Sequence, residues 1–163
     1  MVLRKDWEFN VLQICNYNKT GKLESYFNFI RNNIDELEGD ICEVGVYRGH
    51  SLLATALLLK ELGSNKIVFG FDSFSGFPSY HENDSLSKFD FLYKNGNISE
   101  RHYQDYILNI KHKGFVSDMA ISPSTISSSM DFSETSRVLL EKKIDYLELD
   151  NIRLMDGDFK ETM

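Results

Sequence analysis

The chain has little cysteine and little proline. Its 163 residues include only two cysteines and two prolines. Cys15 and Cys42 lack the spacing of metal ligands, so neither a zinc module nor a disulfide framework is expected, and both should be reduced. Cys42 lies in an apolar run and is interpreted as a small buried hydrophobic residue. The scarcity of proline and the lack of internal repeats give no sign of a linker between two domains.

Excess positive charge and long hydrophobic runs are also lacking. The formal net charge is -7, and the lysines and arginines are scattered, so there is no basic face for nucleic-acid phosphates. The longest apolar run, residues 52–59, is too short to span a bilayer, and the chain does not begin with an apolar segment of signal-peptide length. We therefore expect a cytoplasmic protein that acts on small molecules and binds neither nucleic acid nor membranes.

The chain does contain the material for one hydrophobic core. Hydrophobic residues make up 42% of it, including twelve Phe and eight Tyr, which is enough apolar surface to offset the entropy lost on folding. We expect a single domain, residues 1–163. Within it, residues 1–38 should form an N-terminal helical segment, 39–78 a ligand-binding βαβ unit, and 80–130 an insertion of loop and helix.

Hydrophobic periodicity predicts how helices and strands alternate. Residues 22–37 carry apolar side chains at helical spacing, and Gly39 ends that helix. A short apolar strand (40–46), a glycine turn and a nearly all-apolar helix (51–62) lead to a second strand (66–71). Strand, turn, helix and strand within about thirty residues form a βαβ unit, in which the two strands are parallel.

The second half of the chain has weaker signals. Residues 73–92 are predicted to form a surface loop, because they combine glycine, proline and polar residues. A helix is predicted from its N-cap Ser99 to Gly114, and residues 117–130 are interpreted as a surface insertion or lid. The next expected element is a helix that Ser133 caps, with an apolar stripe formed by Val138, Leu139, Leu147 and Leu149. A strand over 152–155 follows and ends at Asp156, Gly157 and Asp158.

The ends of the three predicted strands carry the candidate ligand-binding residues, since ligands of open α/β sheets bind beyond the carboxyl ends of the strands. Gly45 and Gly49 let the backbone turn tightly and approach a ligand, and the next helix begins with free N–H groups. Asp72 lies where such folds place a carboxylate that accepts hydrogen bonds from ribose hydroxyls. Asp158 is a candidate for contacting an adenine amino group, and Phe159 for contacting its ring.

Each candidate also has an interpretation without a ligand. A Gly-x-x-x-Gly turn can be a packing feature. Glu43 is a carboxylate inside an apolar strand, and its burial costs desolvation energy unless it has a partner. Three explanations are open: a functional role, a buried salt bridge to Arg48, or a contact with the backbone. Asp72 can cap a turn at Ser73 and Phe74 instead of holding ribose. The residues alone leave these alternatives open.

Two motifs together resemble the macrocin O-methyltransferase family. The first is Asp40-Ile-Cys-Glu-Val-Gly-Val-Tyr-Arg-Gly-His-Ser51, and the second is Gly70-Phe-Asp-Ser-Phe-Ser-Gly-Phe-Pro78. The segment from Leu149 to Thr162 resembles the third-strand segment of that family. The resemblance therefore runs discontinuously from residue 39 onward.

The resemblance implies a Rossmann-like class I methyltransferase fold, with three layers (α/β/α) and largely parallel strands in this N-terminal portion. It also implies S-adenosylmethionine as the methyl donor and a small-molecule or sugar hydroxyl as the acceptor. By position, the methionine part of the cofactor would be held by Glu43, Gly45, Tyr47, Gly49 and Ser51, and the ribose by Asp72. The expected cofactor-binding set is completed by Val46, Ser73, Asp158 and Phe159.

The resemblance further implies assistance by magnesium, whose carboxylate ligands follow the third strand in the family and are not expected among these residues. No catalytic base is assigned. The domain is expected to be incomplete, and the unpaired edge of the first strand could serve a homo-oligomer. Two other functions stay open. One is a truncated, inactive fragment that binds cofactor or a partner. The other is an NAD-dependent oxidoreductase, although Tyr47 and His50 replace two glycines of its fingerprint.

Overall fold

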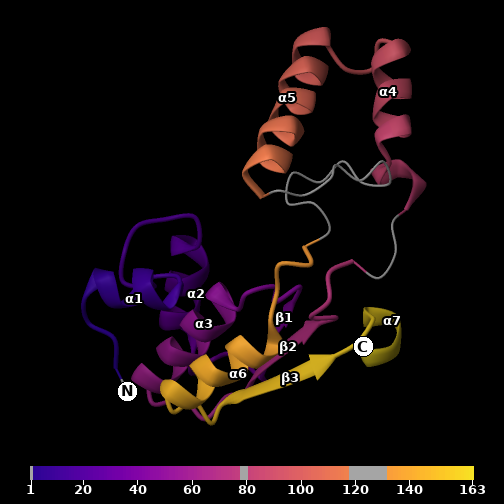
Figure 1. The fold of residues 1–163 in the computed structure, drawn as a ribbon. Coiled ribbons are helices and arrows are strands. Elements are labelled where there is room, and N and C mark those ends of the chain that lie inside the picture. Colours follow the sequence, from indigo (N-terminus) through magenta and orange to yellow (C-terminus); the bar gives the residue numbers. More distant parts are fainter. Residues whose placement is uncertain (1, 78–80, 118–131) are drawn as a thin grey trace. The chain divides into compact units, whose positions relative to one another are not determined.

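Helices and strands alternate along the chain in the computed structural model, which describes residues 2–77, 81–117 and 132–163 (Figure 1). The strands are β1 (Ile41–Val44), β2 (Val68–Asp72) and β3 (Ile152–Asp156). The helices are α1 (Asp6–Leu12), α2 (Glu24–Asn33), α3 (His50–Glu61), α4 (Leu86–Lys94), α5 (Glu100–Ser117), α6 (Arg137–Tyr146) and α7 (Phe159–Thr162), with a short 3-10 helix, η1 (Glu82–Asp84).

The three strands form one parallel sheet in the order β1, β2, β3. Ile41 pairs with Val68, and Val68 pairs with Ile152, so the strands begin at the same level. Their carboxyl ends therefore meet at one edge of the sheet. The predicted βαβ unit, its parallel pairing and the third strand are confirmed.

Helix α3 lies at the centre of the hydrophobic core. All of its residues from 52 to 59 are buried, as its nearly all-apolar sequence predicts. Thr55, the polar member, donates its hydroxyl to the carbonyl of Ser51 and shares a hydrogen bond with the hydroxyl of Tyr26 in α2. These bonds satisfy the one polar group in the buried part of the helix and tie α2 to α3.

Helices α3 and α6 lie on the same side of the sheet (Figure 1), as two right-handed crossovers require. On the other face, Cys42 is exposed, and the side chains of Val44 and Met155 are 49% and 37% exposed. The interpretation of Cys42 as a buried residue is therefore wrong, because this face is open at β1, although Phe71, which pairs with Val44 in the register, is buried. The structure shows an α/β fold with a parallel three-stranded sheet. The second helical layer of the expected α/β/α arrangement stays a prediction.

The structure corrects two expectations after β2. The predicted loop over 73–92 contains α4, whose N-cap Ser85 accepts a backbone hydrogen bond through its hydroxyl. The polar residues around this helix dominate the composition, but the helix buries Phe89 against α5. Helix α5 also continues past Gly114 to Ser117, because a glycine inside a helix lowers its stability without ending it.

Helix α6 begins later than expected. Its N-cap is Ser136, whose hydroxyl accepts a hydrogen bond from the backbone, so the prediction of Ser133 as the cap is wrong. The expected apolar stripe is wrong as well. The buried residue of the helix is Leu140, whereas Val138 and Leu139 are exposed, and the buried Leu147 and Leu149 follow the helix.

The chain divides into two compact units. Unit 1, Met1–Phe74 with Glu134–Met163, contains the sheet and helices α1, α2, α3, α6 and α7. Unit 2, Ser75–Ser133, contains η1, α4 and α5. In unit 2 the rings of Phe89 and Tyr103 are stacked with their centroids 5.5 Å apart, which joins the two helices. The predicted insertion over 117–130 lies outside the described residues except for its first residue.

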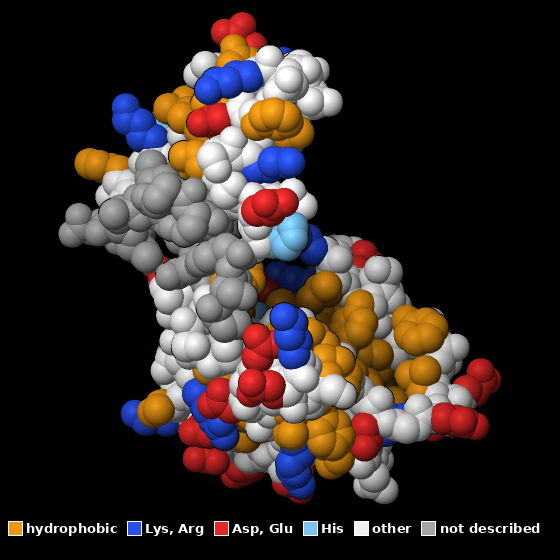
Figure 2. Space-filling model, turned by 90° about the vertical axis from the view of Figure 1, so that its right-hand side faces the viewer, with side chains coloured by type: hydrophobic (Ala, Val, Ile, Leu, Met, Phe, Trp, Pro, Cys, Tyr) orange, Lys and Arg blue, Asp and Glu red, His pale blue; other side chains and the backbone are white. Residues whose placement is uncertain are grey.

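Unit 1 has a partly apolar surface. Figure 2 shows hydrophobic side chains next to one another on one face of this unit, among acidic and basic ones. Trp7 and Val11 of α1 are 61% and 72% exposed, and Phe29 of α2 is 56% exposed. None of the helices in the described parts of the chain has the length and hydrophobicity of a membrane span.

Candidate functional site

The loop between β1 and α3, residues 45–49, lies at the carboxyl edge of the sheet. Three of its residues have a positive φ, namely Gly45 (84°), Tyr47 (53°) and Gly49 (75°). Glycine adopts this conformation freely, whereas it costs another residue about 1 to 2 kcal/mol. Tyr47 therefore needs contacts that hold it in place.

Two hydrogen bonds hold the peptide groups of Tyr47. Its N–H donates to Oδ2 of Asp72, at the end of β2, over 2.7 Å. Its carbonyl accepts a hydrogen bond from the hydroxyl of Thr135 over 2.5 Å. The strained residue is thus held from the second strand and from the segment before α6.

Asp72 has a structural role in addition to the expected ligand role. Its Oδ1 accepts a hydrogen bond from the N–H of Phe74 over 2.7 Å, so the alternative of a cap for the turn at Phe74 is confirmed. A carboxylate has about four acceptor sites, and these two backbone bonds leave capacity for ribose hydroxyls. The next residue, Ser73, is half-buried. The ribose role stays a prediction.

Glu43 is a half-buried carboxylate beneath the loop. Its Oε1 accepts a hydrogen bond from the hydroxyl of Ser51, in the first turn of α3, over 2.9 Å. Burial raises the pKa of Glu43 to about 7; the negative charge of Asp72 adds to the rise, and hydrogen bonds from Ser51 and the backbone of Leu52 oppose it. The expected backbone contact is therefore present, and the group titrates near neutral pH.

Arg48 does not pair with Glu43. Its guanidinium binds the carboxylate of Glu134, with 2.6 Å between Nη2 and Oε2, and lies 5.1 Å from the centroid of the Tyr47 ring. The alternative of a buried salt bridge between Glu43 and Arg48 is therefore wrong. The guanidinium is instead held by the carbonyl and the carboxylate of Glu134, in the segment before α6.

The glycines of the site have different roles. At Gly45 an added Cβ would meet nothing within 4 Å, which leaves open space for a ligand, as expected. At Gly49 it would overlap the side chain of Leu140, so this glycine is needed for packing against α6. At Gly70, which was not a candidate, it would come within 2.8 Å of the buried Val46. Val46 is 3% exposed, so its side chain belongs to the core, and contact of Val46 with a ligand stays a prediction.

The end of β3 reaches the same edge of the sheet. Asp156 pairs with Asp72 in the strand register, and the N–H of Gly157 donates to the carbonyl of Asp72 over 3.1 Å. Asp158 caps α7 by accepting a backbone hydrogen bond of 2.9 Å, and Phe159 beside it is 43% exposed. The meeting of three strand ends is confirmed. Contact of Asp158 and Phe159 with adenine stays a prediction.

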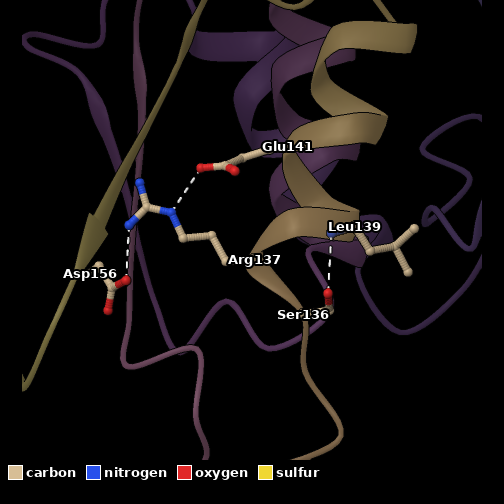
Figure 3. Close-up of polar contacts among 5 residues, drawn as sticks. All are labelled: Ser136, Arg137, Leu139, Glu141 and Asp156. Atoms are coloured by element: carbon tan, nitrogen blue, oxygen red, sulfur yellow. Dashed lines mark hydrogen bonds and ion pairs between the residues drawn. The ribbon is translucent and has the colours of Figure 1, made fainter.

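Arg137 joins α6 to the end of β3 at this edge (Figure 3). Its Nη1 donates to Oδ2 of Asp156 over 2.9 Å, and its Nε donates to Oε1 of Glu141 over 2.8 Å. Its guanidinium also lies 5.8 Å from the centroid of the Phe74 ring. No local sequence pattern predicts this pair, because only the packing of α6 brings Arg137 to the strand.

His50 begins α3 and was not a candidate. Burial, together with the positive charges of Lys143 and Arg48, lowers the pKa of His50, so the imidazole is neutral at pH values near 7. Its Nε2 is buried without a hydrogen-bond partner among the described residues. In residues 2–77, 81–117 and 132–163, no three His, Cys, Asp or Glu side chains gather as ligands for a metal ion.

A parallel α/β sheet whose strand ends carry a glycine loop and acidic residues is the arrangement in which open α/β proteins bind ligands beyond the carboxyl ends of the strands. The model of the family "Macrocin-O-methyltransferase (TylF)" matches residues 6–111, and the chain belongs to this family of O-methyltransferases. The resemblance of the two motifs is thereby confirmed, and the match also includes the N-terminal helices. The segment from Leu149 to Thr162 lies outside the match, so its resemblance stays a prediction. No curated protein matches the chain significantly.

Proposed function

We propose that this chain binds S-adenosylmethionine at the carboxyl edge of its sheet and serves the methylation of a hydroxyl on a small molecule or sugar. The observation that supports the proposal most directly is the hydrogen bond between Tyr47 and Asp72, which joins the two family motifs into one site. The family match supports transfer of the methyl group to oxygen.

The residues at this edge suit the proposed cofactor. The carboxylate of Glu43, which ionises at a pKa of about 7, offers a negative charge for an ammonium group. Asp72 retains acceptor capacity for ribose hydroxyls. The open space over Gly45 lets a ligand approach the backbone.

We propose that the sheet is one half of a Rossmann-like, three-layer class I fold. Its order, β3-β2-β1 when followed from the other edge, is the order of the first half of a doubly wound sheet. The exposed face with Cys42 and Val44 is the face that a second helical layer would cover. The other edge of β1 pairs with no strand among the described residues, and it supports a homo-oligomer because an unpaired strand edge readily pairs with another chain.

Methyl transfer is an in-line displacement that depends on alignment of donor and acceptor. The bound cofactor supplies an activated methyl group on a sulfonium. The residues of this chain hold the cofactor in a loop whose backbone is already fixed by Asp72 and Thr135, so little reorganisation accompanies binding. The described residues offer no metal-ligand cluster, so magnesium takes no part in the proposal, and the base that accepts the hydroxyl proton is not assigned.

Calorimetric titration with S-adenosylmethionine and S-adenosylhomocysteine tests the proposal. We expect both to bind the folded chain. Asp72→Asn should weaken binding by about tenfold through loss of a charged hydrogen-bond acceptor, whereas Asp35→Asn, an exposed change in the turn after α2, should not. A folded sample that binds neither compound would overturn the proposal.

The same experiment separates the two alternatives. Binding of NAD without binding of S-adenosylmethionine would favour an oxidoreductase. Binding of S-adenosylmethionine without methyl transfer to any offered hydroxyl would favour a fragment that binds cofactor alone. Tyr47 and His50, in place of two fingerprint glycines, hinder the backbone approach that a pyrophosphate needs, which favours the methyltransferase.

A further inference from the structure

Thr135, in the segment that precedes α6, contacts the proposed cofactor loop. Its hydroxyl donates to the carbonyl of Tyr47, with 2.5 Å between Oγ1 and O. The preceding residue, Glu134, holds Arg48 twice. Its carbonyl accepts a hydrogen bond from Nε of Arg48 over 2.9 Å, and its carboxylate pairs with Nη2 over 2.6 Å. Two consecutive residues before α6 thus contact two consecutive residues of the loop.

The contact from Thr135 is made to Tyr47, the one non-glycine residue of the loop with a positive φ. Tyr47 has a φ of 53°, and a residue other than glycine keeps such a conformation only where its surroundings hold it. Asp72 holds the N–H of Tyr47, and Thr135 holds its carbonyl. The two peptide groups that flank the left-handed φ and ψ angles are therefore both fixed.

We propose that Thr135 is a positioning residue for the S-adenosylmethionine loop. Together with Asp72 it keeps Tyr47 in the left-handed conformation, and the shape of residues 45–49 in turn sets the affinity for the cofactor. The effect on affinity rests on the proposed function, but the effect on the loop does not require a ligand. Thr135 lies 88 residues from Tyr47 in the sequence and belongs to neither family motif.

Hydrogen exchange of the ligand-free chain tests the effect on the loop. In Thr135→Val, which keeps the shape of the side chain and removes the donor, we expect the amides of residues 45–50 to exchange about five- to tenfold faster, as loss of one hydrogen bond implies. Thr135→Ser keeps the hydroxyl and should exchange like the wild type. Thr135→Ala is a second variant without a donor, and Thr20→Val is the matched control at an exposed site.

A general loss of stability would be visible in the amides of β2, which serve as the internal reference.

A double-mutant comparison isolates the role of backbone strain at Tyr47. In a Tyr47→Gly background, glycine adopts the positive φ without support, so Thr135→Val should change loop exchange by less than about twofold. A loop that exchanges at the wild-type rate in Thr135→Val would overturn the proposal, and so would an equal effect of Thr135→Val in both backgrounds.

Titration with S-adenosylhomocysteine adds the effect on affinity. We expect Thr135→Val to bind it about five- to tenfold more weakly than the wild type, and Thr135→Ser to bind within about twofold. If the wild type binds neither cofactor form while the exchange results hold, the proposed function fails and the role of Thr135 in the loop stands. If the wild type binds and Thr135→Val binds equally well with an unchanged loop, the role of Thr135 fails.

Discussion

The N–H of Tyr47 donates a hydrogen bond to Oδ2 of Asp72 over 2.7 Å and joins two residues that are 25 positions apart. Tyr47 follows β1, and Asp72 ends β2, so the parallel pairing of these strands brings both residues to one edge of the sheet. Asp72 is therefore a structural residue as well as a candidate ligand for ribose. Its effect on stability can be measured without any ligand.

Replacement of Asp72 should destabilise the fold. Asp72→Ala leaves the N–H groups of Tyr47 and Phe74 without their acceptor, and we expect the free energy of unfolding to fall by about 1 to 3 kcal/mol. Asp72→Asn keeps one amide oxygen and should lose less. Urea denaturation measures both. Equal stability of Asp72→Ala and the wild type would mean that the two bonds contribute nothing to folding.

Glu43 should make the protein less stable as the pH rises. Its pKa is about 7 in the folded chain, against an ordinary value of 4.5. Between these values the folded state keeps a proton that the unfolded state has released, so the free energy of unfolding falls by roughly 3 kcal/mol in total as the pH rises. The contribution is complete below pH 4.5 and is lost as the pH passes about 7.

Glu43→Gln should remove this dependence, because glutamine does not ionise and can still accept the hydrogen bond from Ser51. We expect the variant to be more stable than the wild type at about pH 8 and similar to it at about pH 5. Denaturation curves at both pH values measure the difference, with Glu38→Gln as an exposed control. A variant that loses stability with pH as steeply as the wild type would contradict the expectation.

The two loop glycines should differ in their tolerance of alanine. Both have a positive φ, 84° at Gly45 and 75° at Gly49, so both substitutions have a similar backbone cost. Only at Gly49 does a Cβ overlap Leu140, which is 2% exposed and confined by the core. Gly49→Ala should therefore lose about 1 to 3 kcal/mol more than Gly45→Ala. Thermal unfolding compares them, and a partial recovery in Gly49→Ala with Leu140→Ala would confirm the overlap.

Loss of the Arg137 ion pairs should matter little. The side chains of Arg137 and Asp156 are 38% and 46% exposed, and ion pairs at such exposure contribute about 0 to 1 kcal/mol because water screens them. Arg137→Met removes the guanidinium but keeps an unbranched apolar side chain, and should lower the free energy of unfolding by less than about 1 kcal/mol. A loss of more than about 2 kcal/mol in urea denaturation would show that the pair is more shielded than its exposure indicates.

The local pattern of the sequence determined the elements of the βαβ unit and the third strand. Strands β1, β2 and β3 and helix α3 form where the apolar runs predict them, because local preference agrees with the tertiary pairing of the strands. Helix α3 is buried from 52 to 59, whereas β1 and β3 leave several side chains exposed. The prediction failed after β2, where polar residues surround a short segment with apolar side chains. Helix α4 was missed, and Ser133 was taken for the cap that Ser136 provides.

Tertiary structure alone decided how the site is held together. The acidic and glycine residues of the motifs could be found by type and spacing, but their partners could not. Tyr47 is bound by Asp72 and Thr135, which lie 25 and 88 residues away in the sequence, and Gly49 is needed because of Leu140. Such contacts depend on the strand register and on the packing of α6 against the loop, and no local sequence pattern encodes either of them.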